Sequence, residues 1–327
     1  MPPLRLQPLF KQRPWGGRQL AQRWQKPDAN STGWAESWEV VDLGADQSRV
    51  VGGPYDGDSL HDLVRERPAE LLGRHAACQQ FPLLFKFLDA AETMSVQVHP
   101  NDTQATTLAP EQHGKSEAWL ILAADSDSRL SVGLKPDVDR IALERHLATG
   151  SPSRIEQCLH SIPARVGDVI SVPAGTVHAI GAGIALAEIQ QPSDVTFRLF
   201  DWNRRDAEGH SRPLHIEQAL QCIDFSLGPV EPLVPPRSPI GQGDLSEKLI
   251  HTEHFIWRRH TLTGARFRLP ETDCCRILSL LAGHALIESD SGREALLAGE
   301  SLLIPAACGA IVIEPSAGAV LLETLPS

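Results

Sequence analysis

The chain has 327 residues, enough for two domains of ordinary size. Hydrophobic residues make up 42% of it and charged residues 22%, which is typical of a soluble globular protein. The formal net charge of −11 argues against nucleic acid and anionic membranes as partners.

The first 55 residues alternate short apolar pieces with Pro and Gly, as edge strands and turns do. This stretch has no apolar core of signal-peptide length, and no segment of the chain approaches the roughly 20 apolar residues of a membrane span. None of the six cysteines forms a C-x-x-C pair, which favours reduced thiols. We therefore expect a cytoplasmic protein without a membrane partner. Residues 58–78 show helical spacing and predict two short helices separated by Pro68.

The string SVQVHPND, from Ser95 to Asp102, predicts a strand that ends in a turn. Side chains alternate between the two faces of a strand, so Gln97 and His99 point the same way. Residues 101–114 contain Asn, Asp, Pro and Gly, and we expect an irregular loop there, near a pocket.

Two further strings bring charged and polar groups to strand ends. In HGKSEAWLIL, the side chains of Lys115, Glu117 and Trp119 share one face of a strand that continues into a core. In GDVISVPAGTVHAIG, a strand leads into a tight turn, where Gly175 supplies a backbone angle that a Cβ would forbid. This turn delivers His178 at the start of the next strand.

Together these strings offer two oxygen and two imidazole ligands, a set that suits zinc or a similar divalent ion with room left for substrate. A lone histidine in a strand is more often a satisfied or exposed imidazole than a ligand, so the argument depends on the joint pattern. The four candidate ligands are Gln97, His99, Glu117 and His178.

The rest of the chain predicts a mixture of short helices and many strands. A helix is expected from 137 to about 148 with a second short one after the Gly-Ser-Pro break, strands dominate 162–202, and another short helix is expected at 212–222. Residues 228–243 carry five prolines and three glycines, the composition of a linker. From residue 249 onward, apolar runs recur between turn signals, an all-β pattern.

This last section contains a repeat of an earlier one. Gly299 and Pro305 have the same separation as Gly167 and Pro173, each enclosing a short apolar run. If the alignment of these two segments is continued, Ala310 stands at the position of His178. We infer two barrels, the first metal-bearing and the second structural, although a G-x5-P spacing is common in strand-turn-strand proteins.

The spacing Gly167-x5-Pro173-x-Gly175-x2-His178 resembles the second sequence motif of the cupin superfamily. The strings QVHPND, GKSEAW, VPAGTVHAIG and FRLFDW, with PWGG, ESWE and FPLLFKFLDA upstream, resemble those of the type I mannose-6-phosphate isomerases in their short bacterial form. The similarity runs from about residue 5 to about 225. Two departures, Leu120 and Ile180, could reshape the pocket rim.

The resemblance implies one zinc ion per chain, held by the four ligands named above, and a sugar 6-phosphate substrate. It implies that Arg198 is the catalytic arginine, and that Lys86, Lys115 and Ser95 lie near the sugar phosphate. It places further acids in the pocket and two residues on the cleft wall; these are Glu188 and Asp194, then Trp15 and Glu36.

The expected fold is mainly β: two cupin barrels with a few short helices. Residues 1–235 would form the catalytic metal-binding domain and residues 236–327 a degenerate cupin-like domain without metal. The expected activity is the interconversion of D-mannose 6-phosphate and D-fructose 6-phosphate through an enediol, by a monomer or a weak homo-oligomer.

The sequence leaves the general base of that reaction open. Glu188, Asp194 and a water held by the metal are candidates, as are Lys86 and Lys115 if their surroundings depress their pKa. Two other functions also stand beside the isomerase. One is a non-catalytic sugar-phosphate-binding bicupin, and the other is an iron or manganese cupin dioxygenase.

Overall fold

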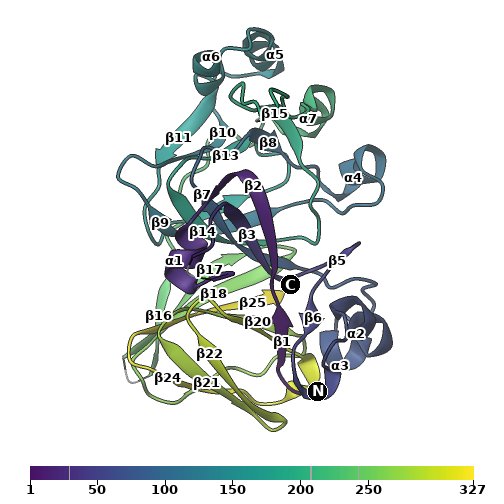
Figure 1. Cartoon of the computed structure of the whole chain (residues 1–327), viewed down its shortest axis with the longest axis vertical. Helices are drawn as coiled ribbons and strands as arrows, with labels where there is room; N and C mark the ends of the chain where they lie inside the picture. Colours follow the sequence, from purple (N-terminus) through teal and green to yellow (C-terminus); the bar gives the residue numbers. More distant parts are fainter. Residues whose placement is uncertain (29, 207, 242) are drawn as a thin grey trace.

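The computed structural model describes residues 1–28, 30–206, 208–241 and 243–327. Figure 1 shows two β-structures stacked along the long axis, with helices at the far end of the first and beside the second. The helices are α1 (Gln19–Trp24), α2 (Leu60–Glu66), α3 (Pro68–Leu72), α4 (Asp102–Leu108), α5 (Arg140–Ala148), α6 (Pro152–Glu156), α7 (Ile216–Cys222) and the 3-10 turns η1 (Gly53–Tyr55) and η2 (Ala306–Cys308). None of the described helices is long and apolar enough to cross a membrane.

The first β-structure consists of a five-stranded and a six-stranded sheet. The order of the five-stranded sheet is β11 (Leu159–Pro163), β10 (Arg129–Leu134), β13 (His178–Ile180), β8 (Val96–Val98) and β15 (Phe197–Phe200). The order of the six-stranded sheet is β12 (Val169–Val172), β9 (Glu117–Ala124), β14 (Ile184–Gln190), β7 (Leu84–Ala90), β2 (Leu9–Gly17) and β3 (Trp34–Val40). Apolar side chains of both sheets, including Trp119, Val132 and Ile180, form one core between them. This is the barrel that carries the candidate ligands.

The second β-structure consists of an eight-stranded and a four-stranded sheet. The eight-stranded order is β16 (Arg237–Gly241), β17 (Asp244–His251), β18 (Phe255–Leu262), β25 (Ala319–Pro326), β20 (Arg276–Ala282), β23 (Ser301–Ile304), β1 (Leu4–Gln7) and β6 (Arg49–Val50). The four-stranded order is β19 (Phe267–Arg268), β24 (Val312–Pro315), β21 (His284–Ser289) and β22 (Gly292–Leu297), and the small pair β4 (Asp42–Leu43) and β5 (Asp46–Gln47) lies apart. The expected fold class, mainly β with two cupin-like barrels and few helices, is confirmed.

The two barrels pack against each other through an apolar cluster. Phe85 of β7 lies edge-on to Trp257 of β18, with ring centroids 6.5 Å apart, and Trp24 of α1 stacks on Phe87 at 5.0 Å. The N-terminal strand β1 pairs with β23, so the start of the chain joins the sheet of its last section. The division of the chain into domains at residue 235 stays a prediction.

The helix predictions at 58–78, 137–148 and 212–222 match α2, α3, α5 and α7, with the expected break at Pro68. The expectation of an irregular loop at 101–114 was wrong, because α4 occupies residues 102–108. Asn101 caps this helix by accepting from the Gln104 amide, and the Gln104 side chain accepts from the Asn101 amide in return. That reciprocal cap offsets the weak helix propensity of the three Thr residues in this helix.

Candidate metal centre and surrounding cavity

Three adjacent strands of the five-stranded sheet place His178, Gln97 and Arg198 side by side. His178 of β13 is the ladder partner of Gln97 of β8, and Gln97 is in turn the partner of Arg198 of β15. Ladder partners project from the same face of a sheet, so these three side chains form a row. The tight turn before β13 has the left-handed backbone predicted at Gly175, with φ of +88°, and the Gly175 amide donates to the carbonyl of His99 at 2.9 Å.

The six-stranded sheet supplies a second row that faces the same interior. Glu117 begins β9, while Glu188 of β14 pairs with Trp119 on one side and with Lys86 of β7 on the other. The Trp119 indole N–H donates to Glu188 Oε2 at 3.0 Å.

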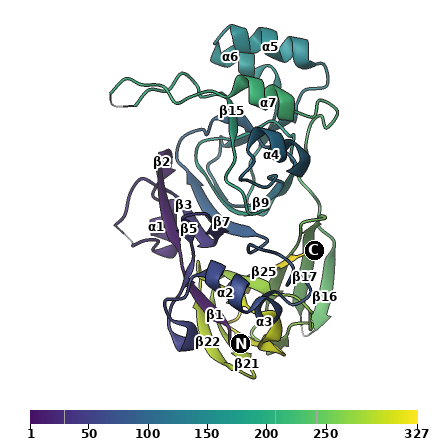
Figure 2. The same cartoon turned by 90° about the vertical axis from the view of Figure 1, so that its right-hand side faces the viewer.

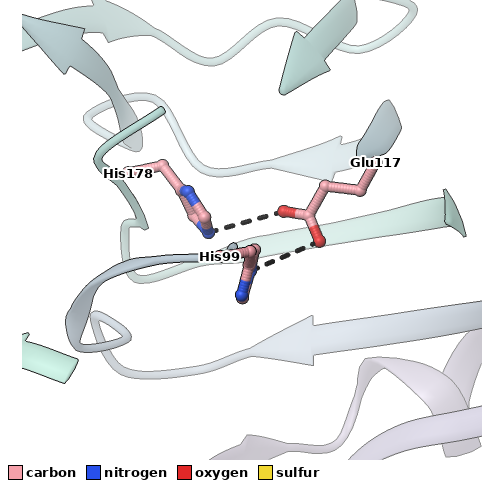
Figure 3. Close-up of side chains that lie close together, drawn as sticks. All are labelled: His99, Glu117 and His178. Carbon is pink, nitrogen blue, oxygen red and sulfur yellow. Dashed lines mark ion pairs between the residues drawn. The ribbon is translucent and has the colours of Figure 1, made fainter. Parts of the chain in front are cut away.

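His99, Glu117 and His178 come together between the rows, as Figure 3 shows. Their ligand atoms lie within 4.8 Å of one another, and all three residues are buried. The Nε2 of His99 is 3.6 Å from Glu117 Oε2, and the Nε2 of His178 is 3.4 Å from Glu117 Oε1. Two ligands of one tetrahedral zinc ion lie roughly 3.3 Å apart. The spacing therefore fits one small metal ion.

Backbone carbonyls orient both imidazoles. His99 Nδ1 lies 2.8 Å from the carbonyl oxygen of Val195, and His178 Nδ1 lies 2.9 Å from that of Thr176. This contact keeps the proton on Nδ1 and turns the Nε2 lone pair toward Glu117, as metal-binding histidines require. Burial lowers the pKa of His99 well below its ordinary value and, although the Thr176 carbonyl opposes it, lowers that of His178 to about 4. Both rings are thus neutral at pH 7 and can act as ligands.

Gln97, the fourth candidate ligand, lies beside His178. Its Nε2 lies 3.2 Å from His178 Nε2, and a 180° turn of the amide would bring Oε1 to the same place. Lys115 Nζ lies 3.0 Å from His99 Nε2 and donates to Glu117 Oε2, so this group already attracts one cation. The donor set of two imidazoles, a carboxylate and an amide fits a divalent ion such as zinc.

A cavity of about 500 Å³ opens beside this group. It is lined by ten of the twelve residues singled out in the sequence, namely Trp15, Glu36, Lys86, Ser95, Gln97, Lys115, Glu117, Glu188, Asp194 and Arg198. The two histidines are not on its wall but contact residues that are, because His178 touches Gln97 and His99 touches Lys115. All twelve are therefore gathered in one place.

Most charges on the cavity wall are paired. Lys86 Nζ lies 2.9 Å from Glu188 Oε1 and 3.5 Å from Glu36 Oε2. Burial disfavours the ammonium, but Glu188 and then Glu36 outweigh this and raise the pKa of Lys86. Lys86 therefore stays protonated, which contradicts the alternative that a depressed pKa makes it the base.

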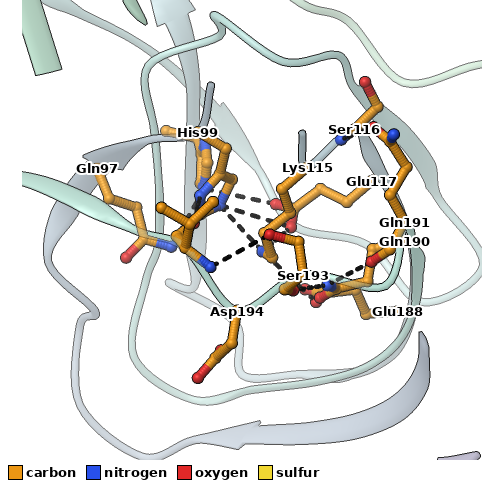
Figure 4. Close-up of polar contacts among 12 residues, drawn as sticks. Gln97, His99, Lys115, Ser116, Glu117, Glu188, Gln190, Gln191, Ser193 and Asp194 are labelled. Carbon is orange, nitrogen blue, oxygen red and sulfur yellow. Dashed lines mark hydrogen bonds and ion pairs between the residues drawn. The ribbon is translucent and has the colours of Figure 1, made fainter. Parts of the chain in front are cut away.

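The pKa values of the two pocket acids, Glu188 and Asp194, are raised as well. Burial, and then the charge of Glu117, raises the pKa of Glu188, and burial raises that of Asp194 in spite of Lys86. Figure 4 shows the Asp194 carboxylate turned away from His99 and Glu117. Its side chain is exposed to the cavity. A carboxyl with a raised pKa can hold and release a proton closer to neutral pH than an ordinary one.

The sequence reasoning missed two arginines of the wall, Arg13 and Arg212. Arg13 Nε lies 3.3 Å from Glu36 Oε1. Arg13 directly precedes the PWGG string, of which only the tryptophan was chosen. Arg212 was the first residue of the short helix expected at 212–222 and was given no role in the site. Its contact with the cavity depends on how the chain returns after β15, which no local spacing signals.

The fold and the site together define a cupin-like protein with a buried His-Glu-His group that can bind a metal ion, set against a polar cavity. Residues 4–128 match the family model "Phosphomannose isomerase type I, catalytic domain". The mannose-6-phosphate isomerase ManA of Bacillus subtilis is 32% identical over 317 residues, covering 95% of this chain and 96% of that protein. The mannose-6-phosphate isomerase of Streptococcus mutans is 33% identical, covering 93% and 92%.

Solved structures agree with this relationship. The crystal structure of the mannose 6-phosphate isomerase from Bacillus subtilis superimposes with a TM-score of 0.90 at 26% identity, over 99% of both chains. The apo enzyme from Salmonella typhimurium shares the fold, with a TM-score of 0.73 at 17% identity. The chain belongs to the type I phosphomannose isomerase family.

Proposed function

We propose that this chain interconverts D-mannose 6-phosphate and D-fructose 6-phosphate, with one zinc ion held by Gln97, His99, Glu117 and His178. The observation that carries the proposal is the convergence of His99, Glu117 and His178 within 4.8 Å beside a polar cavity of about 500 Å³. Membership of the family supports the same reaction and substrate. When bound, zinc supplies Lewis acidity that polarises a substrate oxygen.

The reaction needs a proton to leave C2 of the aldose and arrive at C1, while the hydroxyl proton of O2 passes to O1. The enediol formed between the two transfers carries hydroxyls on both carbons. Glu188 and Asp194 are the carboxyls available for the carbon proton, because both line the cavity and both have a raised pKa. The other chain groups only need to orient the sugar and stabilise charge on its oxygens.

The cations that line the cavity can orient the sugar and stabilise negative charge on its oxygens. Lys86 remains protonated between two carboxylates and can donate to an oxygen that gains negative charge. Lys115 donates to the candidate ligand Glu117 and can stabilise charge on the same oxygens, while Arg198 lines the cavity from the strand beside Gln97. Trp15, Glu36 and Ser95 line the cavity and bind the sugar.

A coupled assay with mannose 6-phosphate, before and after treatment with a chelator, tests the proposal. Turnover that is lost on chelation and restored by zinc supports it, and glucose 6-phosphate at the same concentration should react far more slowly. Binding of mannose 6-phosphate without any turnover, with or without added zinc, would instead favour the non-catalytic sugar-phosphate-binding protein. Iron or manganese in the purified protein would favour the dioxygenase.

A further inference from the structure

Two guanidinium groups lie close enough on the cavity wall for their charges to interact. Arg198 and Arg212 both line the cavity, although 13 residues separate them in the chain. Figure 2 shows the segment after β15 projecting from the barrel before the chain returns toward α7. The returning segment is hydrogen-bonded to β15. Arg198 Nη1 donates to the carbonyl of Pro213 at 2.8 Å, and the His215 amide donates to the carbonyl of Arg198 at 2.8 Å.

Among the described residues that line the cavity, positive charge exceeds negative charge only around Arg198 and Arg212. Lys86 has two carboxylates within 3.5 Å, and Lys115 has one in hydrogen-bond contact. Arg198 Nε, in contrast, is buried and makes no hydrogen bond to any described residue. Burial, and next the charge of Arg212, lowers the pKa of Arg198, as expected for two cations held close together. An unpaired buried N–H and two like charges together favour an anion at this position.

Asp201 fixes the direction in which Arg212 points. Its Oδ2 accepts from Arg212 Nε at 2.8 Å and its Oδ1 accepts from Arg212 Nη2, a two-point contact along one edge of the guanidinium plane. Arg204 Nη2 donates to the same Oδ1 at 2.6 Å. The Asp201 side chain is only 6% exposed, so the contact is held inside the protein. With one edge of the Arg212 plane engaged, its Nη1 edge is left for the cavity.

We propose that Arg212 and Arg198 together bind the phosphate group of the substrate, and that Asp201 is the positioning residue that aims Arg212 at it. The proposal rests on the proposed function, since it names the seat of the phosphate in that same cavity. It also assigns different parts of the sugar to different cations. Lys86 and Lys115, already paired with carboxylates, face the reacting carbons and their oxygens, rather than the phosphate that the sequence resemblance gave them.

The test compares Arg212→Gln and Asp201→Asn with a matched control from the same segment. Arg205→Gln removes an exposed arginine whose Nη1 donates to the carbonyl of Gly209 and which does not line the cavity. We measure kcat and KM with mannose 6-phosphate, and the inhibition constant of inorganic phosphate as a competitor. A charge-assisted bidentate contact corresponds to roughly 10- to 100-fold in affinity.

Arg212→Gln should raise KM and the phosphate inhibition constant together by that factor, with a smaller change in kcat. Asp201→Asn should do the same to a lesser degree, and Arg212→Lys should recover part of the loss. Arg205→Gln should leave all three quantities unchanged. A merely structural role of Arg212 would change kcat and thermal stability without a selective loss of phosphate inhibition.

Two results would overturn the proposal while leaving the isomerase intact. One is an active Arg212→Gln enzyme with wild-type KM and phosphate inhibition, and the other is a Lys86→Met enzyme that alone loses phosphate inhibition. Failure of the proposed function looks different, because the wild-type protein itself would then show no turnover of mannose 6-phosphate. If Asp201→Asn fails to fold, Arg212→Gln still decides the matter, because its side chain is partly exposed.

Discussion

Glu323 of the second barrel occupies the ladder position that Glu188 occupies in the first. Strands β18, β25, β20 and β23 follow one another in the second barrel as β7, β14, β9 and β12 do in the first. Glu188 pairs with Lys86 across β7, with an ion pair of 2.9 Å, and Glu323 pairs with Arg258 across β18, with an ion pair of 3.1 Å. A buried carboxylate and its cation are therefore present in both copies.

The charges inside the two barrels differ at the ladder position of Glu117. Glu117 pairs with Val172, at the end of the first G-x5-P segment, and Arg276 pairs with Ile304, at the end of the second. A guanidinium thus stands where the first barrel has a candidate metal ligand, and it donates to Glu323 at 2.6 Å. The second barrel balances its interior charge with its own side chains.

The Glu323 network predicts a pH-dependent part of the stability. Burial raises the pKa of Glu323, but hydrogen bonding to His260 and the charges of Arg276 and Arg258 outweigh it and lower the pKa to about 2. Because the folded-state pKa is depressed, the stabilisation is fully present above the ordinary carboxyl range and is lost as pH falls toward 2. We expect Glu323→Gln to lower the free energy of unfolding by roughly 3 kcal/mol at pH 7.

Urea denaturation from pH 7 to the lowest pH at which both proteins fold should show this difference shrinking below about pH 4.5. Glu271→Gln is the control, since its pair with Arg268 is exposed and its loss should change little at any pH. A difference for Glu323→Gln that stays constant with pH would contradict the prediction.

The turn that delivers His178 should be sensitive to a single methyl group. A Cβ at Gly175 would lie 3.0 Å from the Cβ of Asp224 and 3.2 Å from the carbonyl oxygen of Cys222, on a residue with φ of +88°. We expect Gly175→Ala to destabilise the fold by roughly 1–3 kcal/mol and to lower metal content, because the turn must shift. Gly150→Ala has a similar φ, +61°, but open space around it, so it isolates the backbone effect. Equal losses of metal in both variants, measured with stability in parallel, would refute a steric role for this turn.

Lys86 should be essential for holding two buried carboxylates. Lys86→Met leaves Glu188 and Glu36 without their shared cation, and we expect it to lower the free energy of unfolding by about 3 kcal/mol at neutral pH. Adding Glu188→Gln should restore part of that loss, which a double-mutant cycle by urea denaturation measures. The exposed Lys135→Met serves as control. Strict additivity of the two substitutions would show that the Lys86–Glu188 contact has no energetic role.

The raised pKa values of Glu188 and Asp194 predict where activity is lost in acid. A base must be deprotonated, so the acid limb of the kcat/KM profile should lie above the ordinary carboxyl values of 4.5 and 3.8. The amide variant of the base, either Glu188→Gln or Asp194→Asn, should lose this limb and at least about 100-fold in kcat. If both amide variants keep the wild-type limb and rate, neither carboxyl transfers the proton.

Much of the site could be predicted because it depends on alternation within single strands. The shared faces of Gln97 with His99, and of Lys115 with Glu117, follow from a period of two residues and are found in the structure. The contributions of Arg212 and Asp201 could not be predicted, because they depend on a long return of the chain. The same holds for β1, whose pairing partner lies at the other end of the sequence.

The most direct test of the account is the metal content of the purified protein measured together with its turnover of mannose 6-phosphate, for the wild type, His178→Ala and Arg198→Ala. We expect one zinc ion per chain in the wild type, loss of both metal and turnover in His178→Ala, and retained metal with reduced turnover in Arg198→Ala. A wild-type protein that isomerises at full rate without any bound divalent metal, or a His178→Ala protein that keeps both, would contradict it.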